Sequence, residues 1–377
     1  MNRYNSYKDS GVEWIGEIPK HWRNSKYKFH TNVLSGFPFK SELFDTEDGF
    51  PILRIRDITS GSSKTYYKGE YKEEYVVKSG DLLIGMDGDY NIRWWDNYNV
   101  LLNQRCCSIK EFNSVLRRFL FYVLPFDLQI INDLTYYTTV KHLSNSDIYD
   151  SNLIVPPLSE QQQIVTFLDD KTQKIDSLIQ QKEKKIELLK EKRTSLINHV
   201  VTKGLDSNVE MKDSGVEWIG EIPNHWKTGK LKNNSDLRIS SVDKHILEEE
   251  RKVTVCNYTD VYYNEFITSN LPLRKGSCSE NEYTNFLLKK GDVIITKDSE
   301  SPTDIGVPSL VKDDLENVVC GYHLSIMKSH KTKLVGDYLF RQLQTKRIRS
   351  YFEINSNGIT RFGLGKSSVL ETLLILP

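Results

Sequence analysis

The chain has 377 residues, and its 51 lysine and arginine residues are balanced by 51 aspartate and glutamate residues, so its formal net charge is zero. This length predicts two or three domains with separate cores, and the neutral charge argues against coating of nucleic acid by bulk charge but not against a local basic cleft. No apolar run is long enough to span a membrane, and the N-terminal residues lack the hydrophobic segment of a signal peptide, so we expect a cytoplasmic protein.

A motif near the N-terminus returns almost unchanged in the second half of the chain. Lys-Asp-Ser-Gly-Val-Glu-Trp-Ile-Gly-Glu-Ile-Pro-Lys-His-Trp at 8–22 reappears at 212–226, and only Lys20 against Asn224 differs. Chance does not produce such a match, and the period is too long for a solenoid. The chain is therefore predicted to contain two copies of a whole domain.

The side chains of this motif have two possible roles. We expect Trp14, Ile15, Ile18 and Trp22 to pack at a corner of the first core, and direct binding of a partner is the alternative. Further matched segments support the duplication, including buried strands after a glycine turn and a short helix. The matched pairs are 80–84 with 291–295, 101–109 with 318–326, 119–124 with 338–343, and 141–156 with 362–377.

A long helix is predicted between the two copies. From 159 to 203 there is no proline or glycine, and Gly204 is a suitable stop. At a rise of about 1.5 Å per residue the helix is roughly 65 Å long. An apolar stripe with helical spacing runs along it, and the flanking positions are rich in lysine and glutamate. The stripe consists of Ile164, Leu168, Ile175, Ile179, Ile186, Leu189, Leu196 and Val200.

The charged flanks favour pairing of this stripe with another helix. Packing of a long surface helix on one domain is the alternative. After the second copy the sequence stops at Pro377, at the point where the equivalent helix would begin. The long helix therefore has no internal counterpart in this sequence, and we expect it to need a partner helix.

Together these features resemble the specificity subunit of type I restriction–modification systems. They are the repeated Ser-Gly-Val-Glu-Trp-Ile-Gly-Glu-Ile-Pro motif, the Gly-Asp-Leu-Leu-Ile turn, Leu-Leu-Asn-Gln-Arg at 101–105, and Pro-Pro-Leu-Ser-Glu-Gln-Gln-Gln-Ile at 156–164. The resemblance covers nearly the whole chain. It implies two target-recognition domains of mixed α/β fold, each recognising half of a split DNA site. A central and a C-terminal conserved helix pair as a spacer in that family. This sequence ends where the C-terminal helix would begin, so the resemblance implies that the stripe pairs with another chain, a second copy of this chain or the methyltransferase subunits.

The resemblance implies three parts of the chain: a first target-recognition domain at 1–157, the central helix at 158–203, and a second target-recognition domain at 204–377. It also implies a non-catalytic DNA-binding subunit on which two methyltransferase subunits and the restriction subunits assemble. The alternative is a truncated fragment or decoy. Such a chain would bind methyltransferase subunits or another specificity chain without recognising DNA independently.

The sequence contains no recognisable catalytic or metal-binding motif. Its only Pro-Pro, at 156–157, lacks the neighbours found in amino-methyltransferases, and the glycine-rich segment 358–367 has the wrong spacing for a phosphate-binding loop. The histidines show no metal-ligand spacing, and the cysteines form no Cys-x-x-Cys pair, so we expect buried thiols in a reducing compartment. No cofactor is predicted here. The resemblance places S-adenosylmethionine, ATP and Mg²⁺ in the partner subunits.

Candidate DNA contacts are polar side chains in the segments that differ between the two copies, because Arg or Lys suits guanine, Asn or Gln suits adenine, and basic groups suit phosphate. The candidates are Arg54, Arg56, Arg93, Gln104, Arg105 and Lys141 in the first copy, and Asn257, Thr259, Lys297, Ser299 and Arg361 in the second. We rank Lys141 and Arg361 first, as contacts to phosphate, since they align within one residue. For each candidate the alternative is a solvated surface side chain.

Overall fold

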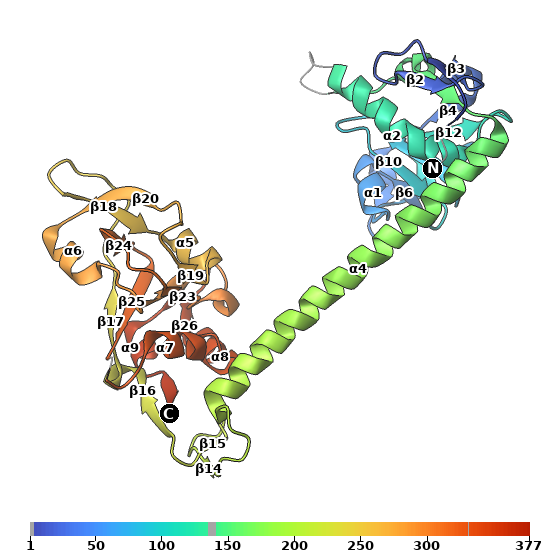
Figure 1. Ribbon diagram of the computed structural model, residues 1–377. Helices are drawn as coiled ribbons and strands as arrows, with labels where there is room; N and C mark the ends of the chain where they lie inside the picture. Colours follow the sequence, from blue (N-terminus) through green and yellow to red (C-terminus); the bar gives the residue numbers. More distant parts are fainter. Residues whose placement is uncertain (1–3, 135–140, 331) are drawn as a thin grey trace. The chain divides into compact units, whose positions relative to one another are not determined.

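The structure is a computed structural model that describes residues 4–134, 141–330 and 332–377. The chain divides into two compact units, residues 1–180 (unit 1) and 181–377 (unit 2). The division falls inside one long helix, α4 (Leu158–Lys203), so each unit includes part of that helix. The colours of Figure 1 run from blue to green in unit 1 and from yellow-green to red in unit 2.

Unit 1 contains an antiparallel sheet with the strand order β10-β9-β12-β4. Its strands are β4 (Thr31–Ser35), β9 (Asp81–Gly85), β10 (Ile92–Trp95) and β12 (Cys106–Glu111). A second, mixed sheet has the order β5-β7-β6-β11-β8. Its strands are β5 (Phe44–Asp45), β6 (Phe50–Leu53), β7 (Tyr66–Tyr67), β8 (Val76–Val77) and β11 (Val100–Leu102).

The central strand β9 is buried along its whole length because both of its faces are covered. Leu82 and Ile84 belong to the cluster that contains α2 (Arg117–Leu134), whereas Leu83 belongs to the cluster on the opposite face. Successive side chains of a strand point to opposite faces of the sheet, so the continuous apolar run of β9 contributes to two cores. The remaining elements of unit 1 are β1 (Tyr7–Asp9), β2 (Glu17–Pro19), β3 (Arg23–Lys26), η1 (Tyr27–Phe29), η2 (Ser41–Leu43), α1 (Ile55–Ser60), η3 (Glu73–Tyr75), α3 (Asn145–Asp150) and β13 (Asn152–Val155).

Unit 2 repeats this arrangement. Its main sheet has the order β17-β25-β21-β23-β19, and smaller sheets have the orders β20-β18-β24 and β22-β27-β26. The strands of the main sheet are β17 (Ser235–Ile239), β19 (Phe266–Ile267), β21 (Val293–Thr296), β23 (Pro308–Val311) and β25 (Leu324–Ser329). Those of the smaller sheets are β18 (Arg251–Cys256), β20 (Arg274–Cys278), β22 (Asp298–Ser299), β24 (Val318–Cys320), β26 (Ser356–Gly358) and β27 (Phe362–Leu364).

The other elements of unit 2 also have counterparts in unit 1. The hairpin β14–β15 corresponds to β1–β2, and the pair β16–β28 corresponds to β3–β13. These elements are β14 (Met211–Asp213), β15 (Glu221–Pro223), β16 (Lys227–Lys230), η4 (Leu231–Asn233), α5 (Tyr258–Tyr263), α6 (Glu280–Phe286), η5 (Pro302–Asp304), α7 (Gly336–Leu343), α8 (Lys346–Ile354), α9 (Lys366–Leu370) and β28 (Leu373–Leu376). The predicted duplication with a mixed α/β fold is confirmed.

Two details of the duplicated segments differ from our expectation. The helix predicted at 119–124 is longer, because Leu124 and Leu128 continue the buried face of α2 past Pro125, which lies inside the helix. In the repeated motif Ile18 is buried as predicted, but Trp14 is 49% exposed. The prediction that Trp14 packs in a core corner is therefore wrong, because the residue lies outside β1 and β2 in the loop that joins them.

The helix α4 is continuous over 46 residues, as predicted (Figure 1). Gly204, with a φ of +78°, follows its last residue, and its amide donates to Val200 O. Every residue from 170 to 196 is exposed. Among the described residues, none of the helices is long and apolar enough to cross a membrane.

The first turn of α4 is fixed to unit 1 through two side chains. Gln161 is fully buried, accepts from the amide of Leu116 at 2.8 Å and donates to Pro156 O at 2.8 Å. Glu160 accepts hydrogen bonds from the motif residue Trp22 at 2.9 Å and from Tyr4 at 2.8 Å, and it lies 2.6 Å from His21 Nε2. Burial acts to raise the pKa of Glu160, but the hydrogen bonds outweigh it and lower that pKa.

The apolar stripe of α4 is packed only at its ends. Ile164 packs against the core of unit 1, and its neighbour Val165 is buried. Near the other end Val201 is buried, at 4% exposure, while Val200 is partly exposed. Leu168 is also partly exposed. The central stripe residues have exposed fractions of about one half: Ile175 55%, Ile179 50%, Ile186 53%, Leu189 54% and Leu196 59%.

Candidate DNA interface

The short helices α1 and α5 occupy equivalent places and begin with the same backbone contact. The Arg54 amide donates to Asp57 Oδ2 at 2.8 Å, and the Asn257 amide donates to Asp260 Oδ2 at 2.8 Å. In each helix an aspartate at the third helical position thus fixes the first turn. The candidate residues Arg54 and Asn257 are the two N-cap residues, so the same backbone presents different side chains.

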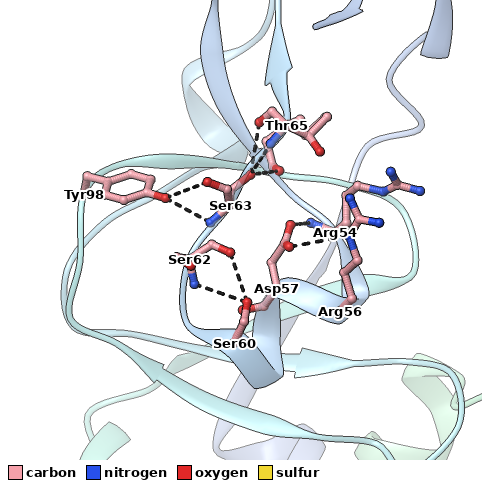
Figure 2. A network of polar contacts seen from close by, with 9 residues as sticks. Arg54, Arg56, Asp57, Ser60, Ser62, Ser63, Thr65 and Tyr98 are labelled. Carbon is pink, nitrogen blue, oxygen red and sulfur yellow. Dashed lines mark hydrogen bonds and ion pairs between the residues drawn. The ribbon is translucent and has the colours of Figure 1, made fainter. Parts of the chain in front are cut away.

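A network of polar contacts holds the chain around α1 (Figure 2). The Ser63 hydroxyl donates to Ile52 O at 2.7 Å, and the Ser63 amide donates to the Tyr98 hydroxyl at 2.9 Å. Burial raises the pKa of Asp57, although the Arg54 amide acts against this effect. Figure 2 shows the side chains of Arg54 and Arg56 on the side of α1 opposite to Tyr98. Both arginines are exposed.

Two of the candidates in unit 1, Arg93 and Lys141, donate to oxygen atoms of the protein. The guanidinium of Arg93 donates to the backbone oxygens of Ile58 and Thr59 at the end of α1. The candidates Gln104 and Arg105 lie in the turn between β11 and β12, and both are exposed. The ammonium of Lys141 donates to the backbone and side-chain oxygens of Asn132 at the end of α2. Arg93 and Lys141 therefore already have internal acceptors.

In unit 2 two neighbouring cavities surround the start of α5. One of about 860 Å³ is lined by Tyr258, Thr259, Ser299 and Arg361 among others, and one of about 530 Å³ by Asn257, Tyr258 and Thr259 among others. Both cavities share Tyr258 and Thr259, and four of the five candidates of unit 2 line one or both of them. The fifth, Lys297, is partly exposed, and its ammonium lies 3.9 Å from Asp298 Oδ2.

Aromatic side chains form one wall of the larger cavity. The rings of Tyr258 and Tyr262 are stacked, with centroids 5.6 Å apart and an interplanar angle of 17°. The Tyr262 hydroxyl donates to Asp304, and this hydrogen bond raises the pKa of Tyr262 to about 12. Burial raises the pKa of Tyr258. Both phenols remain neutral near pH 7, so this wall offers flat rings and hydrogen-bond donors.

Each unit also contains a cluster of one aspartate, one histidine and one arginine. The group in unit 1 is called the Asp87 cluster. In it His142 Nδ1 donates to Asp87 Oδ1 at 2.7 Å, and Arg105 Nη1 lies 3.5 Å from the same oxygen. In unit 2, the Asp298 cluster, His323 Nδ1 donates to Asp298 Oδ2.

Arg361 completes the Asp298 cluster. Its Nη2 lies 3.3 Å from His323 Nδ1, 3.4 Å from His323 Nε2 and 4.0 Å from Asp298 Oδ2.

The sequence reasoning missed the aspartate and the histidine of both clusters. One signal was available, since Asp87 and Asp298 lie at the same distance in sequence from the matched glycines Gly80 and Gly291. The histidines gave no such signal, because His142 and His323 belong to different matched segments. Within the described residues, no group of three or more His, Cys, Asp or Glu side chains is arranged to hold a metal ion.

Comparison with known proteins shows what the first half of the chain resembles. Residues 20–188 match the family model of the type I restriction modification DNA specificity domain. The chain is 37% identical over 196 residues to the EcoBI specificity subunit of Escherichia coli, which covers 52% of this chain and 41% of that protein. It is 25% identical over 252 residues to the MjaVIII specificity subunit of Methanocaldococcus jannaschii, covering 67% of this chain and 57% of that protein.

A solved structure concerned with complex assembly and conformational transition of the type I R-M system has a similar fold. Its TM-score is 0.64 at 15% identity, and the match covers 96% of this chain and 87% of that chain. Residues 20–188 are thus similar to type I restriction modification DNA specificity domains, and the solved structure shows that the fold extends over most of the chain. It spans about half the length of the two curated relatives it matches.

Proposed function

We propose that this chain is the DNA-recognition subunit of a type I restriction–modification complex and recognises a bipartite DNA site, one half with each unit. In this proposal the chain acts in the cytoplasm and is not itself an enzyme. The observation that carries the proposal is the pair of matched helices α1 and α5, which present different side chains from the same backbone at Arg54 and Asn257. Two copies of one scaffold with different contact residues suit two different half-sites.

The candidate side chains fit the edges of DNA bases. Arginine pairs with guanine through two hydrogen bonds, and asparagine pairs with adenine in the same manner. Arg54 and Arg56 in unit 1 therefore favour a half-site with guanine. Asn257, beside Thr259 and the tyrosine wall, favours adenine in the half-site of unit 2.

The helix α4 supports a fixed gap between the half-sites. Contacts tie its first part to unit 1, where Arg118 and Tyr122 both donate to Asp169. Its last part is tied to unit 2, where the Tyr338 hydroxyl donates to Val201 O at 3.2 Å and the Lys346 amide donates to Asn198 Oδ1 at 3.2 Å. Half-sites that face the same side of DNA are separated by whole turns of about 34 Å, and a continuous helix suits such a separation.

Partner subunits supply the chemistry in this proposal. Two methyltransferase subunits with S-adenosylmethionine, and restriction subunits with ATP and Mg²⁺, assemble on the chain. The repeated motif offers matched docking points, because Trp14 is 49% exposed and its counterpart Trp218 is 64% exposed. The exposed centre of the α4 stripe provides a further surface, which pairs with a helix of a partner subunit or of a second specificity chain.

Coexpression with the methyltransferase subunits tests the proposal. Sequencing that detects N6-methyladenine should find a split recognition sequence with a constant gap, and Asn257→Ala should relax the requirement at one half only. Methylation at a contiguous site, or no methylation, would overturn the proposal. Stable binding to the methyltransferase subunits without any methylation would instead support the alternative of a decoy or fragment.

A further inference from the structure

The Asp87 cluster (Asp87, Arg105, His142) and the Asp298 cluster (Asp298, His323, Arg361) are built on the same backbone frame. The Met86 amide donates to Arg105 O at 2.8 Å, and the Lys297 amide donates to His323 O at 2.8 Å. A second pair of bonds also matches, since Leu143 N donates to Met86 O at 2.7 Å and Leu364 N donates to Lys297 O at 2.9 Å. In both units the same three segments therefore meet at the end of the central strand.

The side chains on this frame keep their chemistry but change places. The aspartate follows the central strand in both units. Arg105 and His323 occupy the same turn position, and both have a left-handed backbone, with φ of +70° and +66°. The third member comes from the segment before Leu143 or Leu364, which supplies His142 in unit 1 and Arg361 in unit 2. An arginine and a histidine have thus exchanged positions around a retained aspartate.

In each cluster the arginine is the most exposed member. The side chains of Arg105 and Arg361 are 57% and 58% exposed, against 25% for Asp87 and 18% for Asp298. The aspartate holds the histidine by a hydrogen bond, and the arginine lies against both. The aspartate and the histidine therefore contact one side of each guanidinium, and the exposed side keeps N–H donors for a ligand.

We propose that the two clusters are equivalent phosphate contacts, in which Arg105 and Arg361 each bind a phosphate of the DNA backbone and the aspartate and histidine position that arginine. This inference rests on the proposed DNA recognition and adds a role for side chains outside the base-contacting set. In this proposal Arg105 has the same role as Arg361, although the two come from different positions of the frame and Lys141 aligns with Arg361 in sequence.

The comparison between the units favours phosphate over a base as the ligand. Phosphates are the same in every DNA sequence, so a phosphate contact is retained when two domains recognise different half-sites. Base contacts have to differ, as the side chains of Arg54 and Asn257 do. Both units keep an aspartate, a histidine and an arginine, although the arginine and the histidine have exchanged positions. This retention fits phosphate, which is the same ligand in every DNA sequence.

Salt dependence of DNA binding tests the arginines in the full chain with its methyltransferase subunits. One probe is a duplex that contains the split sequence found by the methylation experiment, and the other is a duplex with a scrambled sequence. The affinity for each is measured over a series of KCl concentrations. Arg105→Gln and Arg361→Gln should each weaken binding to both duplexes by the same factor and lower the slope of log affinity against log salt by about 0.9. Weakening of the split-sequence duplex alone, or an unchanged slope, would overturn the inference.

Matched controls remove the same charge elsewhere. Lys28 lies 3.0 Å from Asp150, and Lys232 is paired with Glu371, so each is an exposed cation beside a carboxylate. Lys28→Gln and Lys232→Gln should leave the salt slope unchanged. If the wild-type complex did not distinguish the two duplexes, the proposed function itself would fail. Normal discrimination with an unchanged slope in both arginine variants would reject the phosphate contacts alone.

The positioning role of the aspartates can be tested because it predicts the opposite change in DNA affinity from that predicted by net charge alone. Asp87→Asn and Asp298→Asn each remove a negative charge, so bulk electrostatics predicts tighter DNA binding. Loss of the group that positions the arginine predicts weaker binding, by roughly tenfold for one charge-assisted hydrogen bond. Tighter or unchanged binding would reject the positioning role.

An exchange of side chains completes the test in unit 1. Arg105→His combined with His142→Arg places the two groups in the order found in unit 2. This double variant should recover most of the affinity and salt slope that Arg105→Gln loses, because the arginine is again held by the aspartate and histidine. A denaturation midpoint equal to that of the wild-type protein would show that the double variant is folded. If such a folded variant recovered no affinity, the two clusters would not be equivalent.

Discussion

The starts of α1 and α5 show how one backbone carries two sets of contacts. Both turns are closed by an aspartate that accepts from the N-cap amide, yet the N-cap residue is Arg54 in one unit and Asn257 in the other. In the Asp87 and Asp298 clusters the residue types are instead retained. In our proposal, the first kind of position varies with the recognised half-site and the second kind contacts the phosphates of any DNA. The variants below test this distinction.

The largest effect is expected from damage to the shared frame. Leu82 in β9 is fully buried in the core of unit 1. Leu82→Ala should destabilise unit 1 by about 2 to 5 kcal/mol, because it removes buried methyl groups and leaves a cavity. Chemical denaturation followed by hydrogen exchange measures the loss. Ile175→Ala, on the exposed part of α4, is the control and should change stability by less than about 0.5 kcal/mol. Equal losses in the two variants would contradict the exposure of the stripe.

A pH effect should distinguish the two units. In unit 1 the Tyr27 hydroxyl donates to Asp127 at 2.5 Å, and burial raises the pKa of Asp127 to about 6. At the matching place in η4, unit 2 has Leu231. A carboxyl whose pKa is raised by folding stabilises the protein at low pH, and that stability is lost as the pH rises from about 4 to about 6.

Asp127→Asn should remove this pH dependence, which amounts to about 3 kcal/mol for a shift of about two units. Urea denaturation of the variant and the wild-type protein over this pH range provides the measurement. The stability of unit 2 should not change. If unit 1 of the wild-type protein instead gained stability relative to the variant as the pH rises from 4 to 6, the direction of the pKa shift assigned to Asp127 would be wrong.

Sequence recognition should respond next. Arg54→Ala should reduce discrimination in the half-site of unit 1 by about 1 to 3 kcal/mol for each guanine that the arginine recognises, and Asn257→Ala should do the same in the other half-site. Methylation rates on substrates with single base changes measure each effect. Loss of recognition in both half-sites by one variant would contradict the assignment of one half-site to each unit.

The smallest effect concerns the repeated motif. Trp14→Ala and Trp218→Ala should each weaken assembly with the methyltransferase subunits by at least about 1 kcal/mol, since exposed tryptophans often dominate protein interfaces. Their matched positions predict similar losses. Size-exclusion chromatography with light scattering measures the number of bound subunits. Ile18→Ala serves as the contrasting variant, because Ile18 is buried and its loss should lower stability instead.

Much of the fold could be predicted because its signals are local or repeated. The helix from 158 to 203 follows from the absence of proline and glycine, and the duplication follows from the motif at 8–22 and 212–226. The exposure of Trp14 could not be predicted, since an apolar side chain in a loop has no periodicity that separates core from surface.

The candidate site was less predictable because its geometry depends on segments that are far apart in the chain. Nothing in the sequence indicates that Arg93 and Lys141 donate to backbone oxygens within the protein. The sequence equally does not reveal the left-handed backbone of Arg105 and His323, the two residues that lie next to the aspartates. All eleven proposed DNA contacts stay predictions until binding is measured.

The left-handed backbone at Arg105 and His323 carries a consequence for the evolution of such domains. A residue with a β-carbon pays about 1 to 2 kcal/mol to adopt this conformation, whereas glycine adopts it freely. Arg105→Gly and His323→Gly should therefore leave folding stability unchanged or raise it, while they weaken affinity for DNA. If folding stability alone decided these two positions, glycine would suit both turns. In our proposal the polar side chains that stand there instead give up some folding stability in return for contact with DNA.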